Sequence, residues 1–439
     1  MHAAGDLQSP LLSARTVQSW RASSVNVLFV HQGFPGQYLH ICRALAKQGN
    51  HRLVAMGMQQ PRTPPPKGVQ HVIYGASRGN GQDVHPLALE TETKVIRAEA
   101  CAAAAEQLKH QGFRPDVICG HPGWGELLFL PYVWPNVPIL MYQEFYYQIH
   151  GFDYDFDPEF QTELNWQTCA KAHMKNANTL LNLETATWNV APTGFQRSSF
   201  PERFQQRISV IHDGIDAGAA PAKANAGLTL SLRDGQELRQ GEPIITFVNR
   251  RIEPYRGCHS FIRAIPLIQE LQPNARIVIV GAEQGVSYGS VCPQGEWKEH
   301  FMAEIEGSYD PSRLHFAGSL GYADFLTLLK LSQAHVYLTY PFVLSWSLLE
   351  AMSTASAIVG SATAPVMEVI RDGHNGLLVD FFNPKAIAEA VDQLLCDRKL
   401  AHQLGTQARK DALARYSLER CLPRQLELID LVASGALGR

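Results

Sequence analysis

Short apolar runs alternate with segments of helical periodicity along most of the chain. An apolar run of about four to eight residues, bounded by Gly, Pro or polar residues, is typical of a parallel strand that helices cover on both faces. The first half contains such runs at residues 25–30, 52–56, 115–119, 137–142, 179–183 and 208–211. Helical periodicity falls between them, at residues 38–48, 87–111 and 158–176. This alternation predicts an α/β domain over residues 25–212, built from right-handed βαβ units.

The same alternation resumes after a break. Residues 217–227 are rich in Ala, Gly and Lys without a core pattern, so we expect a linker over residues 217–242. Further strands are predicted at residues 244–248, 275–280, 313–316, 335–339 and 357–359, and helices at 258–271, 323–331, from Ser347 onward, and at 384–395. These elements predict a second α/β domain over residues 213–408. Residues 409–439 are mostly of helical pattern and can pack back onto the first domain.

Composition narrows the class of protein. The chain has 439 residues, 45% of them hydrophobic, and a net charge of -3, as expected of a soluble globular protein with more than one core. No window reaches the roughly 18 apolar residues of a membrane span, and residues 1–24 lack a signal-peptide pattern, so we expect a flexible tail there and a cytoplasmic protein. Eight cysteines without a C-x-x-C pair indicate neither a zinc site nor a disulfide framework. The near-neutral charge argues against nucleic acid as a partner.

Candidate ligand-binding residues follow the predicted strands of the first half. The carboxyl ends of strands in open α/β sheets are where ligands bind. Gly33 and Gly36 follow the first strand, where they either let the backbone approach a phosphate or serve turn geometry alone. His121 follows the strand at 115–119, between Gly and Pro, which favours a functional role over apolar packing.

An acidic and aromatic run covers residues 151–159. Its alternating aspartates mimic the start of a calcium loop, but Pro158 stands where such a loop needs Gly, and Leu164 where it needs Glu. We interpret the run as an aromatic surface loop that contacts a sugar acceptor, or as a solvated loop without a ligand.

The second half offers a candidate phosphate site. Arg251 and Arg256 lie between a strand and a helix, and the planar guanidinium fork suits a diphosphate, although ion pairing with Glu253 is an alternative. Glu350 is in the first turn of a helix predicted from about Ser347. It either completes a capping box with Ser347 or binds a ligand.

The order of these signals resembles the retaining glycosyltransferases of family four. The resemblance covers nearly everything from Asn26 onward, and it rests on spaced motifs. They are Asp116-x-x-x-x-His121, His212-Asp-Gly-Ile-Asp216, Arg251-x-x-x-x-Arg256-Gly257, Leu348-Leu-Glu-Ala-Met352 and Glu368-Val-Ile-x-Asp-Gly-x-Asn-Gly376. The resemblance implies the GT-B fold, in which two Rossmann-like domains with parallel sheets face each other across a cleft.

The resemblance also implies roles for these residues. Arg251 and Arg256 would neutralise the donor diphosphate, Glu350 would bind the nucleotide ribose, and His121 would lie near the donor sugar, with no metal or cofactor required. The remaining donor-side residues would be Gly33, Gly36, Leu344, Ser345, Trp346 and Glu368, and we place Glu144 and Tyr146 on the acceptor side. The partners would be a nucleotide-diphosphate sugar and a carbohydrate or lipid-linked acceptor, the latter with peripheral contact at the inner face of a membrane.

The chain departs from the family pattern where the sugar should bind. Phe342 stands eight residues before Glu350, where the family usually has a first Glu. Ala355, Ala357 and Ala364-Pro365 also replace the usual Gly or Pro residues. The leading hypothesis is therefore a retaining transferase active in glycan biosynthesis, and the second is a catalytically impaired relative that binds nucleotide sugar or glycan. A nucleotide-sugar epimerase fits the arginines and Glu350 less well.

Overall fold

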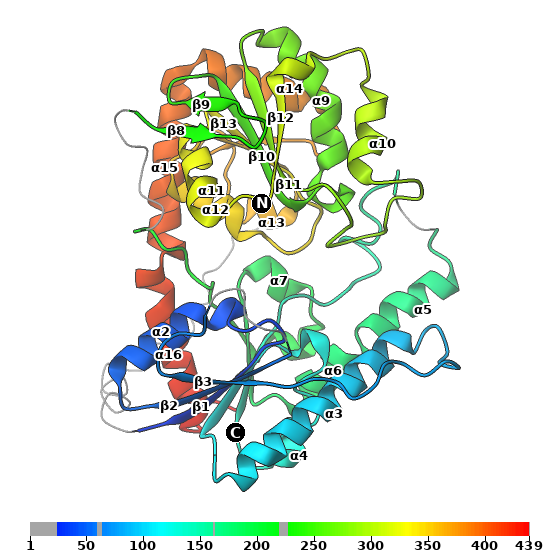
Figure 1. Cartoon of the computed structure of the whole chain (residues 1–439), viewed down its shortest axis with the longest axis vertical. Coiled ribbons are helices and arrows are strands. Elements are labelled where there is room, and N and C mark those ends of the chain that lie inside the picture. The colour runs from blue at the N-terminus through cyan, green and yellow to red at the C-terminus, as the bar shows by residue number, and fades with distance from the viewer. Residues whose placement is uncertain (1–23, 59–63, 161–162, 219–226, 439) are drawn as a thin grey trace.

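The computed structural model describes residues 24–58, 64–160, 163–218 and 227–438. It contains two parallel sheets, one in each half of the chain, which lie one above the other in Figure 1. The seven-stranded sheet has the order β3-β2-β1-β4-β5-β6-β7, and the six-stranded sheet the order β12-β11-β10-β13-β14-β15. The α/β fold class predicted from the alternation is confirmed. The tail predicted over residues 1–24 lies, apart from Ser24, outside the described residues.

The first sheet is buried on both faces. Val27 and Phe29 of β1 join one core, and Leu28 and Val30 join the other, as the period of two in a strand requires. The strands are β1 (Asn26–Val30), β2 (Arg52–Gly57), β3 (Val69–Ile73), β4 (Val117–Gly120), β5 (Ile139–Tyr142), β6 (Trp188–Ala191) and β7 (Ile208–Val210). The helices are α2 (Leu39–Gln48), α3 (Leu89–His110), α4 (Leu130–Val133), α5 (Trp166–Lys175), α6 (Ala177–Thr185), α7 (Gly194–Ser198) and α8 (Glu202–Gln205).

Two sequence predictions in this domain are wrong. Residues 179–183 are part of helix α6, and the strand in this region is β6, which was not predicted. A short apolar run carries too little periodicity to distinguish a buried helical turn from a strand. The strand that pairs with β5 is formed by residues 188–191 instead. The helix predicted over residues 158–176 begins only at Trp166, because Asn165 caps it by accepting from the amides of Gln167 and Thr168.

The second domain carries a hairpin where a linker was predicted. β8 (Thr229–Ser231) and β9 (Glu237–Arg239) pair antiparallel, and Leu230 and Leu238 are buried in the core of that domain. Within residues 217–242, positions 219–226 lie outside the described residues. The linker interpretation is therefore wrong for residues 229–239, because only tertiary packing shows that these isolated leucines meet a core.

The other predicted strands and helices of the second domain are present, and α10, α13 and β15 are additional elements that were not predicted. The strands are β10 (Ile244–Arg251), β11 (Arg276–Ala282), β12 (Leu314–Gly318), β13 (Ala334–Tyr337), β14 (Ile358–Ser361) and β15 (Leu377–Val379). The helices are α9 (Cys258–Leu271), α10 (Trp297–Glu304), α11 (Tyr322–Leu331), α12 (Trp346–Ser353), α13 (Ala364–Met367) and α14 (Pro384–Cys396). Every sheet pairing in this domain apart from the hairpin is parallel.

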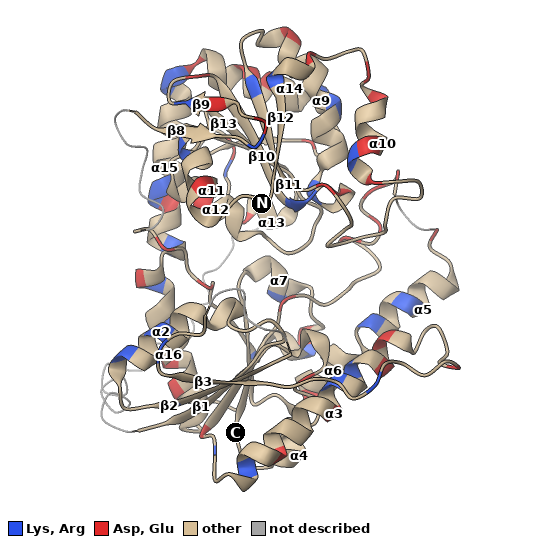
Figure 2. Ribbon diagram, in the orientation of Figure 1, with Lys and Arg blue, Asp and Glu red and all other residues tan. Residues whose placement is uncertain are grey.

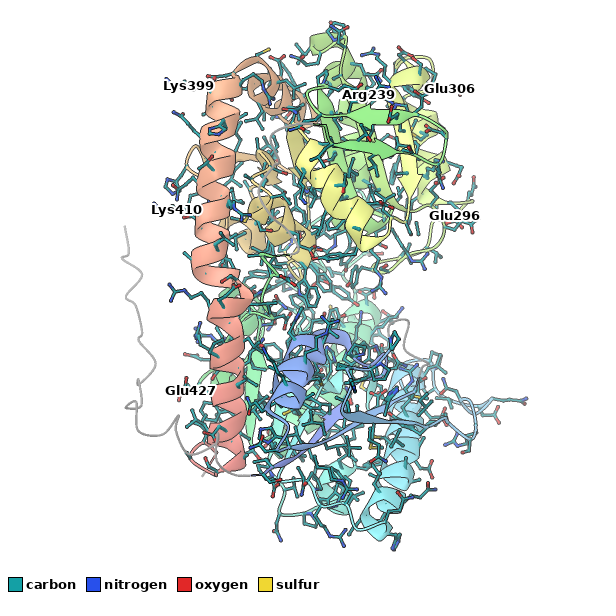
Figure 3. All side chains as sticks on the ribbon, turned by 60° about the vertical axis from the view of Figure 1, so that its left-hand side comes forward. Arg239, Glu296, Glu306, Lys399, Lys410 and Glu427 are labelled. Carbon is teal, nitrogen blue, oxygen red and sulfur yellow. The ribbon has the colours of Figure 1, made fainter. Side chains whose placement is uncertain are left out.

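Two C-terminal helices form a column along both domains (Figures 1 and 3). α15 (Arg398–Tyr416) packs on α12, and α16 (Leu418–Ala433) contacts α2, β4 and β5 of the first domain. The chain passes from the second domain back to the first at Ser417, between α15 and α16. There the amide of Ile215 donates to the carbonyl of Tyr416, and its carbonyl accepts from the amide of Leu418. The charged side chains labelled on this column, Lys399, Lys410 and Glu427, are on its outer side in Figure 3.

The acidic and aromatic run at residues 151–159 packs against the second domain. Asp153 accepts from the Tyr255 hydroxyl, Asp157 from the Tyr340 hydroxyl, and Glu159 forms a two-pronged ion pair with Arg263. The interpretation as an aromatic surface loop is therefore wrong, because Asp153 and Asp157 are buried against the second domain, which the sequence does not reveal as their partner. None of the helices in the described ranges is long and apolar enough to cross a membrane.

Candidate active site between the two domains

A cavity of about 1150 Å³ lies between the domains. The first domain contributes the loops after β1, β4 and β5, and the second contributes the loop after β10 and the start of α12. Loops at the carboxyl ends of parallel strands from both sheets therefore meet in one place, as expected of a ligand site in an α/β protein. Among the predicted site residues, Gly33, Gly36, His121, Glu144, Arg251 and Trp346 line this cavity.

His121 is held in one orientation at the cavity floor. It is 3% exposed, and its ring stacks on Trp124 at 4.4 Å and on Tyr142 at 5.5 Å between centroids. Its Nδ1 accepts from the amide of Gly123 at 3.0 Å, so the neutral ring carries its proton on Nε2. Nε2 has no hydrogen-bond partner and lies 3.7 Å from the Glu144 carboxylate. This histidine can donate a hydrogen bond into the cavity.

The Glu144 carboxylate faces His121 from the loop after β5. Burial raises its pKa, but the facing His121 and the positive charge of Arg256 outweigh burial, so the net pKa is lowered. Its side chain is 40% exposed toward the cavity. Glu144 is therefore an ionised acceptor of hydrogen bonds beside the Nε2 of His121.

His31 is a site residue that our sequence reasoning did not select. It lines the cavity, with its ring 5.7 Å from that of His121, and burial together with His121 lowers its pKa to about 3. A Cβ at Gly36 would meet the His31 ring at 2.4 Å, so Gly36 lets the loop close over this histidine. The strand-end argument that found His121 applies equally to His31.

The second domain presents Arg250 and Arg251 to the cavity. Arg251 donates to the carbonyl of Gln284, which anchors it to the loop after β11. Glu253 is fully buried and accepts from the amides of Ser287 and Tyr288 in the same loop. The alternative of a surface ion pair with Glu253 is therefore wrong, and the guanidinium of Arg251 keeps further donors for an anion in the cavity.

Arg256 lies one side-chain layer behind the cavity wall. It is 6% exposed, and its Nη1 donates to the Thr339 hydroxyl and to the carbonyl of Val343, each at 2.8 Å. Its guanidinium stands 5.2 Å from the ring centre of Tyr288 and 6.0 Å from that of Phe342, and both rings line the cavity. Of the two arginines predicted to clamp a diphosphate, Arg251 lines the cavity and Arg256 does not, and Arg250 lines it beside Arg251.

The start of α12 differs from the predicted capping box. Ser345, rather than Ser347, is the N-cap, and its side chain accepts from the Ser347 amide. Its own amide donates to the Tyr337 hydroxyl, so that N–H is already used, and Leu344 is buried in the core. Of the three residues predicted to supply amide donors, only Trp346 lines the cavity.

Glu350 lies inside α12, too far along the helix to cap it. It is 8% exposed, interacts with the Tyr322 hydroxyl, and burial raises its pKa. The capping-box interpretation is wrong, because a cap partner must stand three residues after the N-cap. Glu350 does not line the cavity as the structure stands.

A buried aspartate joins the two domains below the cavity. Asp213 accepts from the Tyr142 hydroxyl at 3.0 Å and from the indole Nε1 of Trp346 at 2.9 Å. Burial raises its pKa to about 7. Since His121 stacks on Tyr142, this aspartate supports both walls of the site.

Two predicted site residues lie elsewhere. Glu368 accepts from the amides of Gly194 and Phe195, at 2.8 and 2.7 Å, and so connects α13 to the start of α7 in the other domain. Tyr146 packs against Phe200 outside the cavity lining. Within the described residues, no group of three or more His, Cys, Asp or Glu side chains is arranged to hold a metal ion.

Two facing parallel sheets with a ligand-sized cavity between them define a GT-B fold. Two family models match the chain: "Glycosyl transferase family 4 group" over residues 49–220 and "Glycosyl transferases group 1" over residues 231–411. The chain belongs to the family 4 glycosyltransferases.

Curated relatives include glycosyltransferases, and solved structures share the fold. An uncharacterized glycosyltransferase of Methanocaldococcus jannaschii is 26% identical over 54% of this chain and 56% of its own length. The chain spans about half the length of the curated relatives it matches. Sucrose-phosphate synthase from Thermosynechococcus elongatus has the same fold, with a TM-score of 0.68 and 16% identity over 94% of this chain and 100% of its own. Anabaena HepE in complex with UDP-glucose has a TM-score of 0.61 and 14% identity over 94% and 99%.

Proposed function

We propose that this protein transfers a sugar from a nucleotide-diphosphate sugar to a carbohydrate or lipid-linked acceptor, with retained anomeric configuration and without a metal ion. One observation carries the proposal: arginines of one domain and a histidine–carboxylate pair of the other face the same cavity. Transfer requires positive charge where the diphosphate departs and hydrogen-bonding groups where the sugar and the acceptor meet. This cavity offers both.

The second domain is the proposed donor side. Arg250 and Arg251 would bind the diphosphate, and Arg256 would add its field through Tyr288. Glu350 would bind the ribose once the nucleotide lies along α12. The similarity to a fold that holds UDP-glucose in HepE supports a nucleotide-sugar donor.

The first domain would position the reacting groups. The Nε2–H of His121 would donate to a hydroxyl of the transferred sugar, and Glu144 would accept from a hydroxyl of the donor or acceptor. The bond from the anomeric carbon to the diphosphate breaks while a new bond to the acceptor oxygen forms on the same face. The acceptor's hydroxyl proton leaves with the diphosphate, and the arginines stabilise the charge that develops there.

One observation favours a binding protein without transferase activity. Phe342 lines the cavity where the family usually has a carboxylate, and it is 3% exposed against Phe145 and Tyr288. A phenyl ring cannot accept a hydrogen bond from a sugar hydroxyl as a carboxylate does. Glu144 enters the same cavity from the other domain, which supports the enzyme reading.

A panel of nucleotide sugars separates the two functions. We expect some of them to raise the melting temperature and to release nucleoside diphosphate when varied acceptors are added. Stabilisation without release across the acceptor panel would favour the binding protein. No stabilisation by any nucleotide sugar or nucleoside diphosphate would refute both.

A further inference from the structure

One stretch of the first domain lies against the second domain beside the cavity. It comprises residues 151–160, between β5 and α5, and we refer to it as the arm. In Figure 1 the chain that precedes α5 reaches up from the first domain to the second, and the acidic positions of this stretch are red in Figure 2. Phe152, Phe156 and Phe160 of the arm pack against the hydrophobic core of the second domain. The arm therefore follows the first domain in sequence and the second domain in packing.

Aromatic rings enclose the contact between the arm and the second domain. The Phe156 ring lies 5.1 Å from the rings of Tyr340 and Phe381, measured between centroids. The Phe160 ring lies 5.1 Å from that of Trp297 at the start of α10. Because these rings exclude water, the polar contacts of the arm are made in a medium of low dielectric constant, where a hydrogen bond to a carboxylate is strong.

Two carboxylates of the arm each accept from one tyrosine hydroxyl of the second domain. Asp153 accepts from Tyr255 at 2.8 Å, and Asp157 accepts from Tyr340. Both aspartates are 3% exposed. The Asp157 carboxylate also lies 3.2 Å from Nε2 of the buried His259. Burial alone would raise the pKa of Asp157, but His259 and the Tyr340 hydroxyl outweigh burial, so its pKa is lowered and it is an ionised acceptor.

The two tyrosines stand on the loops that form the second-domain wall of the cavity. Tyr255 lines the cavity shortly after Arg251 in the chain. Tyr340 follows β13 and precedes Phe342, which also lines the cavity. The amide of Tyr340 donates to the carbonyl of Tyr255 at 3.0 Å, and the two rings lie 4.6 Å apart. A displacement of one tyrosine therefore displaces both loops.

The hydroxyl bonds supply a precision that ring packing does not. Tyr255 meets Phe342 edge-on at 5.5 Å and lies 6.2 Å from Tyr288, which lines the same wall. Contacts between rings are satisfied over a range of offsets, whereas a hydrogen bond fixes the tip of the ring within a narrow range of distance and angle. A binding site keeps its geometry only when the residues that line it are held in this way from behind.

Resting on the proposed function, we propose that the two buried aspartates of the arm are positioning residues of the donor site. Through the hydroxyls of Tyr255 and Tyr340, they hold the loops after β10 and β13 in the arrangement that binds the nucleoside diphosphate of the donor. The first domain then contributes to donor affinity without touching the donor, from the side of the second domain that lies against the arm.

The test measures the affinity of the full chain for UDP, GDP and ADP by titration calorimetry, and the tightest of the three is used with the variants. Tyr255→Phe and Tyr340→Phe each remove one hydroxyl and keep the ring. We expect each change to raise the Kd roughly five- to tenfold, the usual scale of a lost hydrogen bond to a charged group. The proposal is overturned if both variants bind the nucleotide as wild type does.

A double-mutant cycle tests whether Asp153 acts through Tyr255. Asp153→Ala should raise the Kd by a factor similar to that of Tyr255→Phe. The double variant should bind as weakly as either single variant and no more weakly, because both changes remove the same hydrogen bond. Two factors that multiply in the double variant would show that the residues act independently, and would overturn the positioning role.

Glu159→Gln is the matched control for the attachment of the arm. Glu159 forms its two-pronged ion pair with Arg263 on the same arm, outside the cavity lining. The change weakens this attachment but leaves both tyrosine hydroxyls bound, so the nucleotide Kd should not change. If the Kd follows the melting temperature across all variants, Glu159→Gln included, the arm contributes stability alone and the proposal is overturned.

Hydrogen exchange distinguishes this failure from failure of the proposed function. In the nucleotide-free protein, Tyr255→Phe and Tyr340→Phe should speed amide exchange in the loops at residues 252–257 and 338–345. A chain that binds no nucleoside diphosphate refutes the transferase, and unchanged exchange in these loops would then separately refute the role of the arm. A chain that binds nucleotide with the same Kd in wild type and both tyrosine variants keeps the transferase and loses the positioning residues.

Discussion

The raised pKa of Asp213 predicts how the stability of the protein depends on pH. Its pKa rises from the ordinary 3.8 to about 7 because it is buried between Tyr142 and Trp346. A raised pKa in an acid means that the folded state holds the proton more tightly than the unfolded state does. The contribution of Asp213 to the free energy of unfolding is therefore fully present at low pH. It is lost as the pH rises from about 4 through 7.

The magnitude follows from the two pKa values. At 1.36 kcal/mol per pH unit, the full penalty above neutral pH is at most about 4 kcal/mol. Asp213→Asn keeps a side-chain oxygen for Tyr142 and Trp346 but removes the charge. The free energy of unfolding of the variant, relative to that of wild type, should therefore rise by about 3 kcal/mol from pH 4.5 to pH 8.5. This corresponds to roughly 6 to 12 °C in melting temperature.

Thermal melts of wild type and Asp213→Asn across this pH range are the assay. Asp83→Asn, at an exposed position of the first domain, is the control for the loss of one surface carboxylate. A gap between wild type and Asp213→Asn that stays constant with pH would refute the reasoning. So would a variant less stable than wild type at pH 8.5, since the native carboxylate would then be favourably ionised by its two hydrogen bonds.

Further predictions concern the site and the domain contact. Arg251→Ala should weaken nucleoside diphosphate binding by about 1.5–3 kcal/mol, while the remote, ion-paired Arg313→Ala should not; equal affinities in titration calorimetry would remove Arg251 from the donor site. His121→Ala should lower kcat by roughly 10²-fold with little change in donor affinity, and wild-type turnover in steady-state assays would exclude it. Because Glu350 does not cap α12, Glu350→Gln should reduce nucleotide affinity roughly tenfold without loss of apo stability; a fall in melting temperature alone would contradict ribose binding. Glu368→Ala should lower the melting temperature by removing two charge-assisted bonds between the domains, about 1.5 kcal/mol or more in total, and an unchanged melting temperature would show that this contact is not stabilising.

The local pattern predicted most strands but could not place isolated ones. β1, β2, β5 and β10 are apolar runs buried on both faces, so composition and structure coincide. β6 contains Trp188 and Asn189, and only its position between β5 and β7 makes it a strand. The hairpin β8–β9 is recognisable only from the core it covers.

The same division holds for the site. The strand-end rule selected His121 and Arg251, because the carboxyl edge of a parallel sheet is a property of chain direction. It could not reveal that Arg256 is buried behind Tyr288, that Ser345 caps α12, or that Glu368 reaches across to α7. Each of these depends on which groups another segment brings within hydrogen-bonding distance.

By itself, the sequence determined the fold class, the two-domain alternation and the family, since strand and helix periods and motif spacings are local properties of the chain. Only the tertiary structure decided how the two halves meet. It packed the run at residues 151–159 against the second domain, with Asp153 and Asp157 buried, and placed Asp213 between Tyr142 and Trp346. It also brought Arg97 and Lys175 into one cavity with Arg251, because burial and charge balance depend on neighbours far apart in sequence.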